Sequence, residues 1–147
     1  MLEIKDIHKT FNAGTVNEKR ALNGVNLHLD EGDFVTIIGG NGAGKSTTLN
    51  AVAGVWPVDA GRICIGGTDV TKLPEHKRAK YLGRVFQDPM TGTAAGMQIE
   101  ENMALAARRG AGRGLRVGIT KRERDEYREK LKSLGLGLED RLTAKVG

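Results

Sequence analysis

A glycine-rich stretch between an apolar run and a helix-compatible run constrains this chain more than any other feature. It follows the pattern G-x-x-x-x-G-K-[ST], which is filled by Gly39, Gly44, Lys45 and Ser46. Glycines allow the backbone N–H groups to turn inward, and a side chain there would keep a phosphate away. A helix that follows directs its positive end at the same place. The pattern therefore predicts a phosphate-binding loop between a strand and a helix.

Positions in this stretch have separate predicted roles. The Lys45 ammonium would reach the β- and γ-phosphate oxygens of a nucleotide, and the Ser46 hydroxyl would bind Mg²⁺. Two interpretations of Asn41 stay open, a polar contact to the nucleotide or a turn-forming residue. The remaining predicted nucleotide contacts belong to the loop and the first helical turn: Gly39, Gly42, Ala43, Gly44 and Thr47.

Length and composition favour one soluble domain. The chain has 147 residues, of which 39% are apolar, 28% charged and only 4% aromatic, so we expect an aliphatic core. Its single cysteine, Cys64, cannot form an internal disulfide, which favours a reducing compartment. No apolar run approaches the length that crosses a bilayer, so we expect any membrane role to work through a partner.

The positive charge is concentrated in one segment. The formal net charge is +5, and Arg108–Lys132 alone holds ten Lys/Arg against four acidic residues, a net of +6. A nucleic-acid surface is one interpretation, with steep salt dependence. A solvated helix with interleaved Glu123, Glu126 and Glu129 is the one we favour. Within this segment, the glycine- and arginine-rich Gly110–Gly118 is expected to be mobile.

Hydrophobic patterning predicts a mixed α/β chain. Expected strands are Leu2–His8 (ending near Phe11), Ala21–Leu29, Asp33–Ile38 before the loop, a hairpin of Arg62–Ile65 with Thr68–Thr71, and Tyr81–Phe86. Expected helices are Lys45–Val52, Pro74–Lys80, Gln98–Arg109 and Thr120–Leu134, the last opened by a Thr120/Glu123 capping box; Leu136–Gly147 is expected to be irregular. The early strands and the hairpin would be antiparallel, whereas Asp33–Ile38 and Tyr81–Phe86 would form a parallel α/β unit.

Several further passages accompany the loop. They are Phe11 at the end of the first strand, the helix-Pro-Gly-x-Ile passage Leu49–Ile65, the hairpin Gly66–Val70, and Val85-Phe86-Gln87-Asp88-Pro89, whose Gln87 lies 42 positions after Lys45. Together they resemble the nucleotide-binding subunits of ABC transporters, over essentially Leu2–Gly147. The resemblance implies an α/β fold: a partial P-loop NTPase core, with an N-terminal antiparallel β-subdomain and the start of a helical subdomain.

The resemblance also implies roles for residues outside the loop. Phe11 would stack on adenine, although an ordinary hydrophobic residue at a strand end is the alternative. Gln87 would contact Mg²⁺ or water and sense a transmembrane partner, although it could simply end a strand. Lys45 and Gln87 are then the candidates for catalytic residues, and Ser46 and Gln87 are the candidates for metal contacts. The implied cofactors are ATP and Mg²⁺.

Some motifs of that family do not occur in these 147 residues. They are the Leu-Ser-Gly-Gly-Gln signature, the Walker B Asp with its adjacent Glu base, and the switch His. We therefore expect the N-terminal portion of one ATPase domain, with residues 1–89 as β-subdomain and P-loop core and residues 90–147 as the start of the helical subdomain. Such a chain is expected to bind ATP without hydrolysing it, because the base that activates water is missing.

The implied function is that of an ATP-binding subunit at the cytoplasmic face of the cell membrane. Its partners would be a second nucleotide-binding subunit, as a homodimer, and a transmembrane permease, with import as the direction and no direct nucleic-acid contact. Met90–Gly96 is either a docking site for the permease or an exposed loop. A non-transport ABC ATPase acting on nucleic acid or the ribosome is the alternative, and a non-catalytic nucleotide-binding fragment is another. A GTPase is disfavoured because no Asn-Lys-x-Asp occurs.

Overall fold

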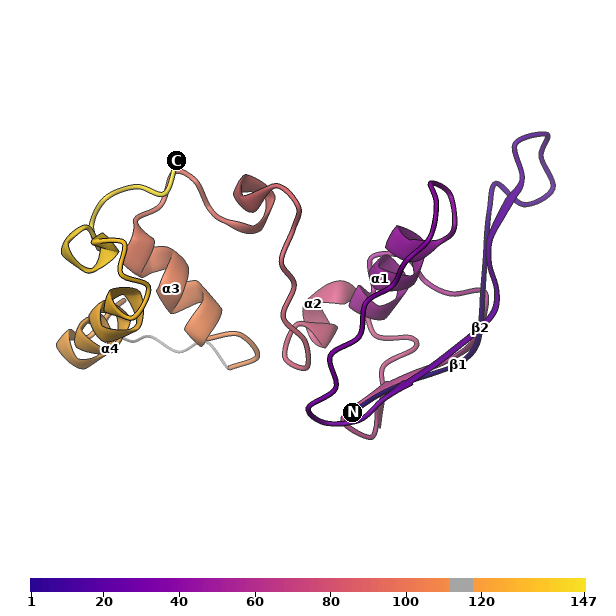
Figure 1. Cartoon of the computed structure of the whole chain (residues 1–147), viewed down its shortest axis with the longest axis horizontal. Coiled ribbons are helices and arrows are strands. Elements are labelled where there is room, and N and C mark those ends of the chain that lie inside the picture. Colours follow the sequence, from indigo (N-terminus) through magenta and orange to yellow (C-terminus); the bar gives the residue numbers. More distant parts are fainter. Residues whose placement is uncertain (112–117) are drawn as a thin grey trace. The chain divides into compact units, whose positions relative to one another are not determined.

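The computed structural model describes residues 1–111 and 118–147, so most of the expected mobile stretch 110–118 lies outside the described residues. The described chain divides into two compact units, Met1–Gly83 and Arg84–Gly147 (Figure 1). The first unit contains the predicted phosphate loop, and the second contains Gln87.

An antiparallel sheet forms the framework of Met1–Gly83. Its strands are β1 (Leu2–Phe11), β2 (Lys19–Leu29), β3 (Ala60–Ile65) and β4 (Thr68–Asp69), in the order β2-β1-β3-β4 within this unit. The β1–β2 pairing runs from Leu2 opposite Leu29 to Phe11 opposite Lys19. The predicted early strands and the hairpin at Gly66-Gly67 are thereby confirmed. One end of the β1–β2 pair carries Phe11.

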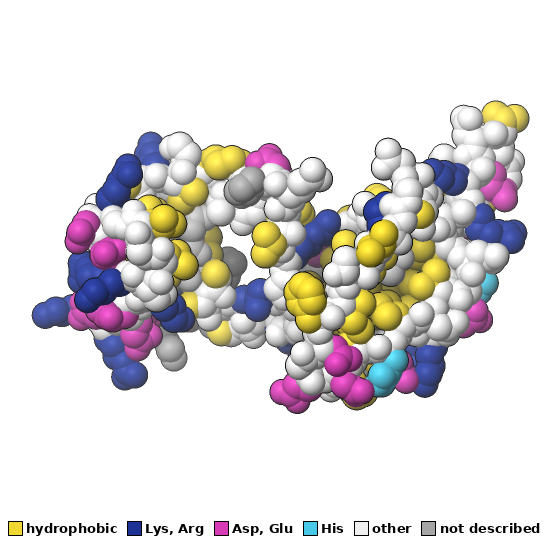
Figure 2. All heavy atoms as spheres, viewed as in Figure 1, with side chains coloured by type: hydrophobic (Ala, Val, Ile, Leu, Met, Phe, Trp, Pro, Cys, Tyr) yellow, Lys and Arg dark blue, Asp and Glu magenta, His cyan; other side chains and the backbone are white. Residues whose placement is uncertain are grey.

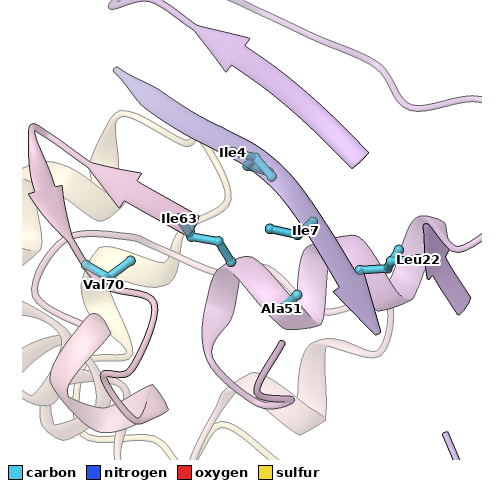
Figure 3. Packing of buried hydrophobic residues seen from close by; sticks show 6 residues of the cluster. All are labelled: Ile4, Ile7, Leu22, Ala51, Ile63 and Val70. Carbon is cyan, nitrogen blue, oxygen red and sulfur yellow. The ribbon is translucent and has the colours of Figure 1, made fainter. Parts of the chain in front are cut away.

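Aliphatic side chains join this sheet to α1 (Lys45–Ala53), the helix that follows the loop. The core consists of Ile4, Ile7, Leu22, Ala51, Ile63 and Val70, each at most 3% exposed (Figure 3). Ala51 supplies the contact from α1, while Leu22 comes from β2 and Val70 from just beyond β4. Burial of these side chains holds α1 against the sheet and fixes where its N-terminus begins.

A buried arginine ties α1 to α2 (Glu75–Arg78), which is shorter than the helix expected over 74–80. Arg78 is 1% exposed, and its guanidinium donates hydrogen bonds of 2.7–2.9 Å to backbone carbonyls of Ala51, Val52, Thr71 and Leu73. Ala51 and Val52 lie in the last turn of α1, where a cation is favourable; the Ala51 carbonyl also accepts from Gly54 N at 3.2 Å. Burial lowers the pKa of Arg78.

Gly54 makes room for this arginine. It ends α1 with a φ of 84°, the left-handed geometry expected for a glycine stop. A Cβ at Gly54 would lie only 2.7 Å from the Arg78 Nε. The glycine therefore serves both the helix end and the guanidinium beside it.

Two expected strands do not form. Asp33–Ile38 and Tyr81–Phe86 have no ladder in the described residues, and Phe34, Ile38 and Val85 are 94%, 90% and 96% exposed. A strand exists only through hydrogen bonds to a neighbour, and no described segment supplies one. The predicted parallel α/β unit is therefore wrong for this chain: its sheet is antiparallel, with helices beside it.

Two helices build the core of Arg84–Gly147. They are α3 (Ile99–Ala107) and α4 (Lys121–Lys132), with short 3₁₀ turns η1 (Pro89–Gly92) and η2 (Leu138–Asp140). Their buried cluster is Ala104, Tyr127, Leu131 and Leu142. The Thr120/Glu123 capping box at the start of α4 is confirmed, with the Thr120 hydroxyl accepting from the Glu123 amide. The boundaries of α3 and α4 fall inside the predicted helices.

A buried carboxylate connects the two helices. Glu100 is 4% exposed and accepts hydrogen bonds of 2.6 and 2.8 Å from the Arg124 guanidinium. Those bonds hold the pKa of Glu100 below its ordinary value, against the effect of burial. A bidentate pair of this kind fixes the orientation of α4 on α3.

The last residues of the chain are more ordered than expected. Besides η2, the segment Leu142–Gly147 exchanges main-chain hydrogen bonds with Ala95–Glu100. Glu100 N donates to Leu142 O at 3.0 Å, and Gly147 N donates to Ala95 O at 3.2 Å. The expectation of an irregular Leu136–Gly147 is therefore wrong in part, because long-range pairing leaves no periodic signal in a short segment.

The surface around α4 carries both signs of charge. Figure 2 shows blue and magenta side chains interspersed over this part of the surface. Arg122 pairs with Glu126 at 3.0 Å, and Arg128 pairs with Asp125 at 3.2 Å. This pattern supports the solvated-helix interpretation of the basic segment. In the described ranges, no helix has both the length and the apolarity that a bilayer crossing requires.

Candidate functional site

The loop Gly39–Gly44 leads directly into the N-terminus of α1. Gly44 precedes the helix with a φ of 86°, and among the described residues no side chain caps α1. A Cβ at Gly44 would lie 2.8 Å from the Ala21 carbonyl oxygen, so only glycine fits between the loop and β2. The first amides of α1 thus lack a side-chain partner. Such amides, with the positive end of the helix dipole, are suited to binding an anion.

Lys45 lies across the loop. Its ammonium donates hydrogen bonds to the carbonyl oxygens of Gly39 and Gly40, the latter at 2.7 Å. Residues 39–43 are exposed, and the Ala43 amide closes a turn by donating to Gly40 O at 3.3 Å. The ammonium therefore lies within a solvent-open curve of backbone. A phosphate that entered this curve would meet a positive charge and the free amides together.

Hydroxyl side chains of the first turn of α1 differ in their surroundings. Thr48 is buried, and its Oγ1 donates a hydrogen bond of 3.0 Å to Gly44 O, so this hydroxyl is engaged by the backbone. Ser46 is exposed and Thr47 is partly exposed, next to Lys45. Protein sites usually hold Mg²⁺ through one or two oxygens, completed by phosphate oxygens and water. An exposed Ser46 hydroxyl beside an anion site fits that requirement.

The aromatic ring of Phe11 is positioned by Trp56. Their ring centroids are 5.0 Å apart at an interplanar angle of 81°, an edge-to-face contact. Phe11 itself stays partly exposed, and Lys9 Nζ lies 5.6 Å from its centroid. The sequence motifs gave Trp56 no role, although it is the only tryptophan of the chain.

Asp59 holds the end of β1 in place. Its carboxylate accepts hydrogen bonds from Thr10 N at 2.6 Å and from Lys9 Nζ at 3.0 Å. These bonds, the Thr10 amide first, lower the pKa of Asp59. The link from Asp59 to the residue before Phe11 spans 49 positions of sequence, which hydrophobic periodicity does not reveal.

Gln87 belongs to Arg84–Gly147. It is exposed in a bend, immediately before η1. The next residue, Asp88, caps η1 by accepting from Met90 N at 2.9 Å and from Thr91 Oγ1 at 3.2 Å. A contact between Gln87 and Mg²⁺ or water stays a prediction, as do the individual roles of Phe11, Asn41 and the loop residues.

Comparison with known families decides the identity of this arrangement. The sequence model of the family described as "ABC transporter" matches residues 22–146. The chain belongs to the ABC transporter family. The match covers the loop, α1, the β3–β4 hairpin and nearly all of Arg84–Gly147, and it confirms the resemblance drawn from the motifs.

Curated relatives of this ABC transporter chain are ATP-binding proteins. A tyrosine transport ATP-binding protein of Clostridioides difficile (strain R20291) is 39% identical over 110 residues, covering 75% of this chain and 44% of that protein. The spermidine/putrescine import ATP-binding protein PotA of Haemophilus influenzae (strain ATCC 51907) is 35% identical over 108 residues, covering 74% of this chain and 27% of that protein. The ABC transporter chain thus spans less than half the length of these relatives.

Solved structures agree with the assignment. A dimeric ATP-binding cassette in a post-hydrolysis state, bound to ADP and Pi, is 30% identical with a TM-score of 0.76, over 99% of this chain and 61% of that chain. A nucleotide-free ATP-binding cassette of an ABC transporter is 27% identical with a TM-score of 0.71, over 100% of this chain and 58% of that chain. The ABC transporter chain therefore has part of the ATP-binding cassette fold.

Proposed function

We propose that this chain is the N-terminal portion of an ATP-binding subunit that couples ATP binding and hydrolysis to transport, in the direction of import. The observation that carries the proposal is the exposed loop before α1, whose helix has no side-chain cap and whose Lys45 ammonium lies on the carbonyls of Gly39 and Gly40. The family assignment makes ATP the ligand of choice for such a loop.

In this proposal different groups of the loop bind different parts of the phosphate chain and the metal ion. Backbone amides from Gly42 to Thr47 bind the terminal phosphate oxygens, while Lys45 exchanges its carbonyl partners for the β- and γ-phosphates. The Ser46 hydroxyl is the protein ligand of Mg²⁺, which supplies charge neutralisation on the phosphates. Asn41 contributes a polar contact at the mouth of the loop.

Phe11 supplies the adenine-binding surface. Its contact with Trp56 and the Asp59 bond to the preceding residue hold the ring at the end of β1, with part of it open to solvent. An aromatic face of this kind stacks on any base, so it adds affinity without strong discrimination. Gln87 keeps its predicted role as a contact to Mg²⁺ or water.

Partners follow from the relatives. The two curated relatives described above are named as transport or import ATP-binding proteins, and one solved cassette is a dimer. We propose a homodimer that works on a separate transmembrane permease at the cytoplasmic face of the membrane, without direct nucleic-acid contact. The ion pairs Arg122–Glu126 and Arg128–Asp125 place acidic residues among the cations of α4, which favours transport over the nucleic-acid alternative.

In this proposal ATP binding and ATP hydrolysis depend on different residues. No Walker B Asp-Glu pair and no switch His accompany the loop in these 147 residues. The chain of 147 residues therefore binds Mg-ATP and turns it over far more slowly than a complete cassette, because no base activates the attacking water.

Calorimetric titration with Mg-ATP tests the proposal. The wild-type chain should bind, and Lys45→Ala should lose tight binding, since the charge facing the phosphates is removed. Lys77→Ala, at an exposed lysine of α2, is the matched control and should bind like wild type. Equal affinity of the Lys45→Ala and wild-type proteins would refute the proposed site. Tighter binding of GTP than of ATP would refute the assignment of the base.

A further inference from the structure

A second lysine lies over the phosphate loop. Lys19 opens β2, directly opposite Phe11 in the β1–β2 register. Its Nζ lies 3.8 Å from the point that a Cβ on Gly42 would occupy, so the ammonium is beside the middle of the loop. Ala21, the next residue on the same face of β2 as Lys19, is also close to the loop. Its carbonyl oxygen lies 2.8 Å from the position of a Cβ placed on Gly44.

Lys19 is available to bind an anion. Its side chain is exposed, and no ion pair or hydrogen bond engages its ammonium in the described ranges 1–111 and 118–147. The neighbouring lysines differ: Lys9 is paired with Asp59, and Lys45 donates to Gly39 and Gly40. An exposed ammonium beside the phosphate loop raises the local positive potential there.

We infer that Lys19 binds a phosphate oxygen of the nucleotide, in addition to Lys45. This inference rests on the proposed function of the loop and extends it to a residue on β2. Lys19 is the cross-strand partner of Phe11, and its ammonium lies beside Gly42, so it connects the proposed adenine-binding residue with the loop that would hold the phosphates.

Nucleotide titrations of Lys19→Ala in low salt test the inference. The affinity for Mg-ATP should fall about fivefold or more, the effect of losing one charge-assisted hydrogen bond at a partly solvated site. The loss should persist for ADP and disappear for adenosine, which has no phosphate. It should shrink in high salt, because screening weakens the contribution of an exposed charge. Lys19→Arg should keep most of the affinity, since it keeps the charge.

Arg20→Ala is the matched control. Arg20 is also an exposed cation of β2, but adjacent strand residues point to opposite faces, so its removal should leave Mg-ATP affinity unchanged. Equal losses in the Lys19→Ala and Arg20→Ala proteins would overturn the inference in favour of a general charge effect. An equal loss for adenosine, or no loss for ATP, would overturn it as well.

The wild-type and Lys45→Ala proteins, measured alongside, separate this test from that of the proposed function. Without ATP binding by the wild type, the loop assignment itself fails. With wild-type binding that depends on Lys45 but not on Lys19, only the inference about Lys19 fails. Thermal unfolding of Lys19→Ala should match the wild type, because the side chain is exposed and makes no contact that stabilises the fold.

Discussion

Replacing Arg78 with alanine should strongly destabilise the unit Met1–Gly83. The guanidinium is 1% exposed and serves four backbone carbonyls, two of them in the last turn of α1. Hydrogen bonds to a charged group contribute about 1.5–3 kcal/mol each, but dehydrating the arginine offsets much of that sum. We therefore expect a loss of about 3–5 kcal/mol, within the range that breaking a buried polar network gives.

Urea denaturation followed by tryptophan fluorescence measures this loss directly. Trp56 is the only tryptophan of the chain and lies in the same unit as Arg78, so its emission reports this unit. The midpoint should fall in Arg78→Ala without a change in slope. Arg78→Met, which keeps an apolar stem and loses the donors, separates packing from hydrogen bonding.

Lys77→Ala provides the control for helix propensity and charge. Lys77 is the exposed neighbour of Arg78 on α2, so its loss should change stability by no more than about 0.5 kcal/mol. If Arg78→Ala lost less than about 1 kcal/mol, the carbonyls of α1 would have to be satisfied by water, and the reasoning from buried unpaired acceptors would be refuted.

Changes at three other positions should have distinct effects. Phe11→Ala should weaken adenine nucleotides by about 1–3 kcal/mol in calorimetry, whereas an equal loss for bare triphosphate would contradict stacking. Gly44→Ala should destabilise the chain by about 1–3 kcal/mol in urea denaturation, because its φ is 86° and the Ala21 carbonyl is too close. Hydrogen bonds from the Thr120 amide, from Arg108 and from the Thr120 hydroxyl lower the pKa of Glu123 from 4.5 to about 2. The ionised Glu123 should therefore contribute its full stabilisation of the fold above pH 4.5. That contribution should fade as the pH falls from 4.5 toward 2, and Glu123→Gln should flatten the acid limb of the thermal midpoint; an unchanged limb would refute it.

Local signals sufficed for much of the structure. The capping box at Thr120 and the Gly66-Gly67 hairpin turn are each determined within a few residues, and each was predicted. The loop pattern also placed the start of α1 at Lys45 correctly. Such features depend on backbone geometry that neighbouring residues alone decide.

Long-range contacts were not predictable in this way. Asp33–Ile38 has strand composition but finds no neighbour in the described chain, so propensity alone predicted a strand that pairing does not support. The bonds from Asp59 to Thr10 and from Arg78 to Ala51 join residues 49 and 27 positions apart. Lys19 was missed for the same reason, since its place over the loop depends on the β1–β2 register.

The main-chain pairing between Ala95–Glu100 and Leu142–Gly147 bears on how this protein can be shortened or tagged. Deletion of the last six residues would leave the Ile99 and Glu100 amides without their acceptors and remove Leu142, which is 4% exposed in the cluster with Tyr127. The segment Ala95–Glu100 would then lose the main-chain hydrogen bonds that it shares with Leu142–Gly147. A shortened chain would therefore have a less ordered Ala95–Glu100 segment, and an affinity tag is better attached at Met1, which is 53% exposed.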